Sequence, residues 1–131
     1  MFLYHQRTGK LEHDRIGLIG FGHSGDPDAG GMDDPAMQSV RSVGPLPVGD
    51  YTIGPPEDRP EHTGEFSMAL TPASTNEMFG RGAFYIHGFR IGLKPGQGGK
   101  GCIEIGPLQR WAVGGAVLGP NRDNHLRVVA E

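Results

Sequence analysis

The stretch that decides the fold is Phe84-Tyr-Ile-His-Gly-Phe89, which is followed after a glycine-rich segment by Gly101-Cys-Ile-Glu-Ile105. Short apolar runs that contain Ile, Tyr and Phe and end at glycine are typical of β-strands. Six glycines and one proline lie between His87 and Cys102, so this connection continues neither strand. We therefore expect two strands, over 83–87 and 102–105, that are joined by a long loop.

The rest of the chain repeats this pattern of short apolar runs between turns. Glycine contributes 23 and proline 11 of the 131 residues, and they fall between the apolar runs. The pattern predicts a mostly β fold in one domain, 1–131, with long loops over 22–44 and 55–64. Further strands are expected at 2–6, 11–13, 15–21, 50–53, 65–71 and 126–129. In the 65–71 strand, alternation places Phe66, Met68 and Leu70 on one face. One short helix is expected over 108–118, although Gly114-Gly115 lowers its helix propensity.

Charge and hydropathy narrow the classes of partner. The formal net charge is −3, and Lys and Arg form no stripe, so the chain lacks the basic surface of a nucleic-acid-binding protein. No apolar stretch approaches the roughly 20 residues of a membrane span. The first residues lack the basic start and long apolar run of a signal peptide. We expect synthesis in the cytoplasm, with no nucleic-acid or membrane partner.

Cys102 and His87 form the strongest candidate for chemistry. A free cysteine is most often a small buried hydrophobe. Here, however, the thiol follows Gly101 and an imidazole ends the preceding strand. A thiolate next to an imidazolium is a reactive nucleophile near neutral pH. Glycine before the cysteine also leaves backbone N–H groups free to stabilise an oxyanion.

Other site types fit the sequence poorly. Zinc needs three or four ligands at recognisable spacing, and one cysteine with scattered histidines does not supply them. The segment 98–102 fails the phosphate-loop pattern, and the acidic loop 26–34 lacks the closing glutamate of a calcium loop. Among the remaining histidines, His23 lies in a glycine-framed turn and is the best candidate to line a cleft. The sequence therefore predicts no metal and no cofactor.

Several motifs, taken together, resemble the L,D-transpeptidases of the YkuD-like class, and most closely the L,D-transpeptidase-like effector family of type VI secretion systems. They are Tyr4-x-Gln-x-Thr-Gly9, Gly22-His-Ser-Gly25, Val43-Gly-Pro-Leu-Pro-Val-Gly-Asp-Tyr-Thr-Ile53, Phe84-Tyr-Ile-His-Gly88 and Gly101-Cys-Ile103. The resemblance implies a compact β-sandwich or barrel that acts on peptidoglycan stem peptides in the periplasm of a target cell. It also implies two protein partners, an immunity protein and a component of the secretion machine.

The resemblance further implies a division of labour in the site. Cys102 would form a thioester with the stem peptide, and His87 would move the proton. The N–H groups of Gly101 and Cys102 would form the oxyanion hole, and a backbone carbonyl just before Gly101 would orient the imidazole. Water would complete an L,D-carboxypeptidase reaction, whereas a D-amino acid would complete a transpeptidase exchange.

Two positions depart from the family pattern. Gly99 stands where the family carries Ser or Thr, and Glu104 stands where the classical enzymes carry Arg. Another cation is then needed for the substrate carboxylate, and the choices are Arg81, Arg90, Lys94 and Lys100. We expect Arg90, because arginine binds a carboxylate through two hydrogen bonds. The expected substrate-binding residues are Arg90, Lys100, His23 and Gly88. A non-catalytic wall-binding or phage or secretion structural module remains the alternative.

Overall fold

The computed structural model describes residues 1–89, 92–94, 96 and 100–131. Ten strands, one 3-10 helix and one α-helix are assigned within these residues. In chain order they are β1 (Phe2–His5), β2 (Lys10–His13), β3 (Gly17–Phe21), β4 (His23–Ser24), η1 (Pro35–Met37), β5 (Gly49–Ile53), β6 (Glu57–Arg59), β7 (Gly64–Pro72), β8 (Phe84–His87), β9 (Ile103–Glu104), α1 (Pro107–Leu118) and β10 (His125–Val129).

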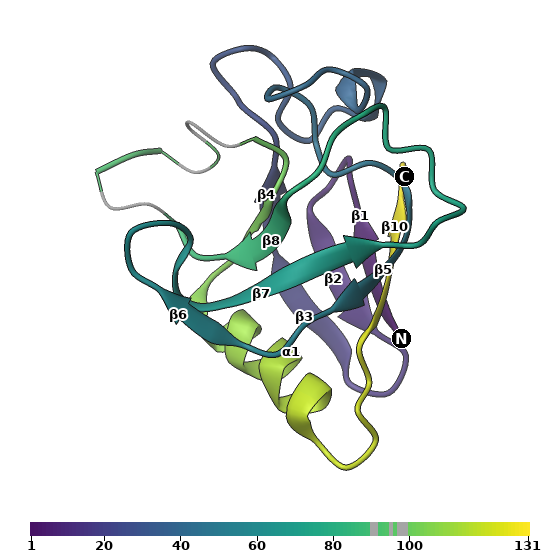
Figure 1. Cartoon of the computed structure of the whole chain (residues 1–131), viewed down its shortest axis with the longest axis vertical. Helices are drawn as coiled ribbons and strands as arrows, with labels where there is room; N and C mark the ends of the chain where they lie inside the picture. Colours follow the sequence, from purple (N-terminus) through teal and green to yellow (C-terminus); the bar gives the residue numbers. More distant parts are fainter. Residues whose placement is uncertain (90–91, 95, 97–99) are drawn as a thin grey trace.

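The strands form one strongly curved sheet that is nearly closed into a barrel (Figure 1). Its order is β3-β2-β1-β10-β5-β7-β8-β9-β4, and β6 pairs with β7 beside this path. The first and last strands of the order, β3 and β4, are separated in the chain by Gly22 alone. A Cβ on Gly22 would lie 2.5 Å from the carbonyl oxygen of Glu104, so only glycine fits this crossing. The mostly β, barrel-type prediction with one short helix is confirmed.

The register of β8 and β9 decides which side chains share a face. These two strands are parallel, with Ile86 opposite Ile103 and His87 opposite Glu104. Both isoleucines are buried in the core. Because successive side chains alternate between faces, His87 and Glu104 point away from that core, and so does Cys102, just before β9. The pairing therefore places the thiol and the imidazole on one face of adjacent strands.

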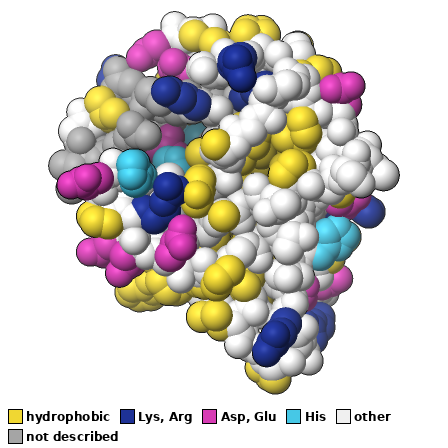
Figure 2. Space-filling model, in the orientation of Figure 1, with side chains coloured by type: hydrophobic (Ala, Val, Ile, Leu, Met, Phe, Trp, Pro, Cys, Tyr) yellow, Lys and Arg dark blue, Asp and Glu magenta, His cyan; other side chains and the backbone are white. Residues whose placement is uncertain are grey.

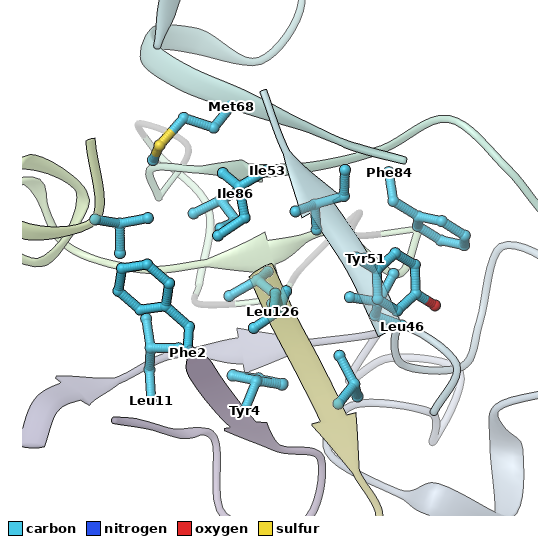
Figure 3. Packing of buried hydrophobic residues seen from close by; sticks show 14 of the residues in the cluster. Phe2, Tyr4, Leu11, Leu46, Tyr51, Ile53, Met68, Phe84, Ile86 and Leu126 are labelled. Atoms are coloured by element: carbon cyan, nitrogen blue, oxygen red, sulfur yellow. The ribbon is translucent and has the colours of Figure 1, made fainter. Parts of the chain in front are cut away.

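The core fills the inside of the curved sheet. Figure 3 shows side chains from β1, β10 and β8, among them Phe2, Leu126 and Ile86, directed toward one interior. Helix α1 contributes Val113 and Val117 to the same cluster. Among the described residues, no helix has both the length and the apolar character needed to cross a bilayer.

The expected loops contain short elements that the sequence does not reveal. Strand β6 lies within 55–64, and β4 and η1 lie within 22–44. A second correction concerns Phe66, which was expected on the face of Met68 and Leu70. Its φ of 50° interrupts the alternation of β7, so that Ser67 and Met68 are both buried. The Phe66 ring instead packs on α1, where a Cβ on Gly114 would lie 2.5 Å from it.

Candidate functional site

His87 ends β8 and is 4% exposed. Its Nδ1 lies 2.8 Å from the carbonyl oxygen of Gly88. A carbonyl oxygen only accepts hydrogen bonds, so Nδ1 carries the ring proton and donates it. In the neutral ring, this leaves Nε2 as the basic nitrogen. The carbonyl of Gly88 thus fixes the orientation of the imidazole.

Cys102 is half-buried and free of any disulfide. Its Sγ accepts a hydrogen bond of 3.3 Å from the backbone N–H of Tyr85, on the adjacent strand. A donor that points at sulfur stabilises the thiolate more than the thiol. The ladder between β8 and the chain before β9 therefore supports the charged form of this side chain.

A pocket of about 390 Å³, which we call the Cys102 pocket, brings the two candidates together. Cys102, His87 and Lys100 line it. The lining also includes Arg59 at the end of β6 and three residues of the β6–β7 turn, Glu61, His62 and Thr63. In Figure 2, basic, acidic and histidine side chains gather around a hollow on the left of the face shown. Three of the expected site residues thus line the same pocket.

A larger pocket of about 650 Å³, which we call the Arg110 pocket, adjoins the first. Both pockets are lined by His62 and Thr63, and we refer to the two pockets together as the groove. Gly88, Glu65 and Arg110 line the larger pocket. Gly88, one of the expected substrate-binding residues, therefore lines a different pocket from Cys102.

Gly101 precedes the thiol in a backbone conformation that favours glycine, with a φ of 103°. A Cβ at this position would lie 2.5 Å from Nη2 of Arg81 and 2.7 Å from the ring of Phe84. The Gly101 carbonyl accepts a hydrogen bond of 3.0 Å from the hydroxyl of Ser24. Both the backbone shape and the packing thus require glycine beside Cys102.

Arg81 is the side chain that packs against Gly101, and it is 7% exposed. Its guanidinium donates to the carbonyls of Gly44 (2.9 Å), Pro45 (2.8 Å), Lys100 (3.3 Å) and Gln38. It therefore ties the segment before β5 to the segment that carries Cys102. With both terminal nitrogens bonded to backbone, Arg81 acts as a clamp and not as the substrate-carboxylate ligand that the sequence offered.

The charge of Arg81 also acts on the site. Burial lowers the pKa of the Arg81 guanidinium, whereas the charges of Tyr51 and Cys102 raise it. Electrostatic interaction is mutual, so the guanidinium favours the thiolate of Cys102 as much as the thiolate favours the guanidinium. The buried cation thus favours the thiolate form of Cys102.

One expected substrate-binding residue, His23, does not line either of these two pockets. His23 pairs with Glu104 across β4 and β9, one strand beyond the His87–Glu104 pair. Its Nδ1 lies 2.9 Å from a carboxylate oxygen of Asp33, and it is not among the described residues that line the groove. Arg90 and Gly99 lie outside the described residues. Glu104, at the family's arginine position, is 3% exposed.

The sequence reasoning missed Arg59 and Arg110. Arg59 lies in β6 with its guanidinium 4.3 Å from the ring centre of Tyr85, which borders the Cys102 pocket. Arg110 lies in α1, eight residues after Cys102 and outside every motif. The only sequence signal for Arg110 is a charged residue within the apolar pattern of a helix.

One group of potential metal ligands occurs among the described residues, namely His13, Asp14 and Asp123, with ligand atoms within 4.8 Å of one another. Cationic groups already contact these carboxylates, because the amino group of Met1 lies 3.0 Å from Asp14 and 3.2 Å from Asp123. None of the three residues lines the groove.

Comparison with known proteins gives one match. A family model described as the Tlde1 domain matches residues 20–113, well over half of the chain. The matched segment includes His87, Cys102 and the β6–β7 turn. No curated protein and no solved structure matches the chain.

Proposed function

Because the chain belongs to the Tlde1 domain family, which is associated with type VI secretion L,D-transpeptidase effectors, we propose that it is a cysteine enzyme that modifies peptidoglycan stem peptides. The observation that carries this proposal is the Cys102 pocket, which both Cys102 and His87 line. The orientation of His87 supports it, because Nε2 is the nitrogen left to accept a proton.

The first half-reaction begins when Nε2 of His87 takes the thiol proton of Cys102. The thiolate Sγ attacks the carbonyl carbon that precedes the terminal D-alanine of a tetrapeptide stem. The C–N bond then breaks, and the imidazolium returns its proton to the leaving amine. The product of this step is a thioester between Sγ and the shortened stem.

The second half-reaction regenerates the thiol. His87 removes a proton from water or from the amine of a D-amino acid, and that nucleophile attacks the thioester. Water gives a carboxypeptidase product, and a D-amino acid gives an exchanged stem. In both half-reactions, the N–H groups of Gly101 and Cys102 stabilise the oxyanion. Gly101 supports this role because its φ of 103° is held by the contacts with Arg81 and Ser24.

The setting of this reaction is a further part of the proposal. We propose that the protein is made in the cytoplasm and acts in the periplasm of a target cell after delivery by the secretion system. An immunity protein in the producing cell and a carrier component of the secretion machine are the proposed protein partners.

The test uses purified tetrapeptide muropeptides with and without added D-methionine, and the products are read by mass. Wild-type protein is expected to release D-alanine and, with D-methionine present, to form the exchanged stem. Cys102→Ala is expected to abolish both products, and His87→Gln to slow them by about 10²–10⁴-fold. His125→Gln changes an exposed histidine of β10 and serves as the matched control.

Intact-protein mass adds a direct readout of the intermediate. With the stem peptide, wild-type protein is expected to gain the mass of one acyl group, which hydroxylamine removes. Cys102→Ser protein is expected to gain no acyl group that hydroxylamine can remove. Equal turnover by wild type and folded Cys102→Ala protein would contradict the proposal. That result would favour a non-catalytic wall-binding module on the same fold.

A further inference from the structure

Arg110 is a buried cation that lines the Arg110 pocket. The residue is 9% exposed, and Nη1 donates a hydrogen bond of 2.7 Å to the carbonyl of Ile105. The Nε atom is buried without a hydrogen-bond partner among the described residues. A buried donor that lacks a partner is costly, by the free energy of removing it from water. The guanidinium therefore has hydrogen-bonding capacity that its contacts within the fold do not use.

Gly88 contacts both the guanidinium of Arg110 and the imidazole of His87 in the proposed site. A Cβ on Gly88 would lie 2.6 Å from Nη1 of Arg110 and 3.0 Å from its Cζ. The guanidinium thus packs directly against the residue whose carbonyl orients His87. Any other residue at position 88 would push the guanidinium away. The absence of a side chain in the His-Gly motif therefore has a local cause in the Arg110 pocket.

A carboxylate of the opposite sign lines the same pocket. Glu65, an exposed residue of β7, borders it together with Arg110. Burial lowers the pKa of Arg110, whereas the negative charge of Glu65 raises it. The two charges therefore interact electrostatically. Yet no ion pair joins them among those formed by the described residues. The two charged side chains therefore line one pocket but do not form an ion pair with each other.

The size and position of the pocket fit a small polar group. Its volume of about 650 Å³ lies within the range of small-molecule sites. Arginine prefers a carboxylate, and a glutamate prefers an ammonium group. A ligand that carries both groups on one carbon offers a partner of opposite charge to each residue. That ligand is the head of a free α-amino acid.

We propose that the Arg110 pocket binds a zwitterionic α-amino-acid head, with its carboxylate on Arg110 and its ammonium on Glu65. This proposal builds on the proposed function, because His62 and Thr63 line both this pocket and the Cys102 pocket. Two molecules present this head near the thioester. One is a free D-amino acid that attacks it, and the other is a diamino-acid residue of the stem whose distal amine and carboxylate are free.

The test measures binding to the Cys102→Ala protein, so that turnover plays no part. NMR titrations use D-alanine, D-alaninamide and N-acetyl-D-alanine, and a stem tripeptide with its diamino-acid head free or N-acetylated. At least one free head is expected to shift the signals of Gly88 and Glu65. Its capped or amidated form is expected to bind about tenfold more weakly or worse. Binding of D-alanine identifies the acceptor, and binding of the uncapped tripeptide alone identifies the stem residue.

Two variants test which protein residue binds each charged group of the ligand. Glu65→Gln is expected to weaken the free head about tenfold and to leave its N-acetyl form unchanged, because only the ammonium contact is lost. Arg110→Lys keeps the charge but loses the planar guanidinium, and it is expected to weaken the free head and the N-acetyl form alike. Circular dichroism checks its fold, and Glu65→Gln carries the test if Arg110→Lys does not fold.

The inference is overturned if every probe binds equally with and without its amine or carboxylate. It is also overturned if no probe binds, or if folded Glu65→Gln and Arg110→Lys proteins bind like the parent. These outcomes are separate from the proposed function. A wild-type protein that fails to process muropeptides while its Cys102→Ala form still binds the free head would overturn only the enzyme proposal.

Discussion

Arg81 carries a buried charge that the fold holds against Gly101, the residue before Cys102. Its guanidinium is bonded to backbone carbonyls, and no carboxylate forms an ion pair with it among those of the described residues. The positive charge is therefore not cancelled locally. A cation within reach of a thiolate lowers the free energy of the charged form relative to the thiol.

Replacing this charge gives a prediction about reactivity. In Arg81→Met protein, the midpoint of the pH profile for Cys102 alkylation by iodoacetamide is expected to rise by about one unit. Arg15→Met removes one positive charge from an exposed side chain of the β2–β3 turn, whose ion pair with Asp123 is worth little. Its midpoint is expected to match that of the wild type. Equal midpoints in Arg81→Met and wild type would limit Arg81 to a structural clamp.

Single residues also show which parts of the candidate site could be predicted from the sequence alone. That Cys102 and His87 line one pocket could be expected from the sequence, because His87 ends one apolar run, Cys102 begins the next, and glycines lie beside both. The role of Arg110 could not be expected, because it depends on the approach of α1 to Gly88, a contact between distant parts of the chain. Arg81 was noticed as a cation, but only the structure shows that carbonyls occupy its terminal nitrogens.

At the scale of elements, replacing each of the two adjacent glycines of α1 by alanine is expected to change the stability of the protein in opposite directions. A Cβ on Gly114 would lie 2.5 Å from the Phe66 ring and 2.8 Å from Pro56, whereas a Cβ on Gly115 would meet nothing within 4 Å. Gly114→Ala is therefore expected to destabilise the protein by about 1–3 kcal/mol through overpacking. Gly115→Ala is expected to stabilise it by about 0.5–1 kcal/mol through helix propensity.

Urea unfolding followed by circular dichroism measures both changes. The two variants add the same methyl group to adjacent positions of one helix, so each is the control for the other. Stabilisation by Gly114→Ala would show that Phe66 and Pro56 yield without cost. That result would remove the packing reason for glycine at this position.

The elements themselves were largely readable from the sequence. The strands at 2–5, 84–87 and 125–129 and the helix at 107–118 follow apolar runs that are long enough to show a period. Strands β4 and β6 contain two and three residues, which is too short for any period to appear. They form because β9 and β7 offer them partners, and a partner strand leaves no trace in the local sequence.

At the scale of the whole molecule, one cluster joins the start of the chain to the segment before the last strand. Nε2 of His13, in β2, donates to the carboxylate of Asp123, while Nδ1 accepts the backbone N–H of Arg15 at 3.0 Å. The amino group of Met1 lies 3.2 Å from the same carboxylate. Asp123 thus links β1 and β2 to the chain that leads into β10, which completes the sheet between β1 and β5.

Because of this cluster, we expect the stability of the barrel to fall as the pH is lowered. Burial alone would raise the pKa of Asp123, but the hydrogen bonds from His13, the amino group of Met1 and Arg15 outweigh it and lower the pKa. A carboxyl group whose pKa is lower in the folded state stabilises that state above its unfolded pKa of about 4. The contribution is lost as the pH falls through the lower, folded-state value.

Asp123→Asn is therefore expected to cost about 1 kcal/mol at pH 7, and the difference from the wild type is expected to disappear near pH 2. Thermal unfolding at several pH values between 2 and 7 measures it. Glu61→Gln removes one exposed carboxylate from the β6–β7 turn and controls for net charge, so its difference from the wild type should stay small throughout. A cost for Asp123→Asn that persists at pH 2 would mean that packing, and not the ionised carboxylate, holds these strands together.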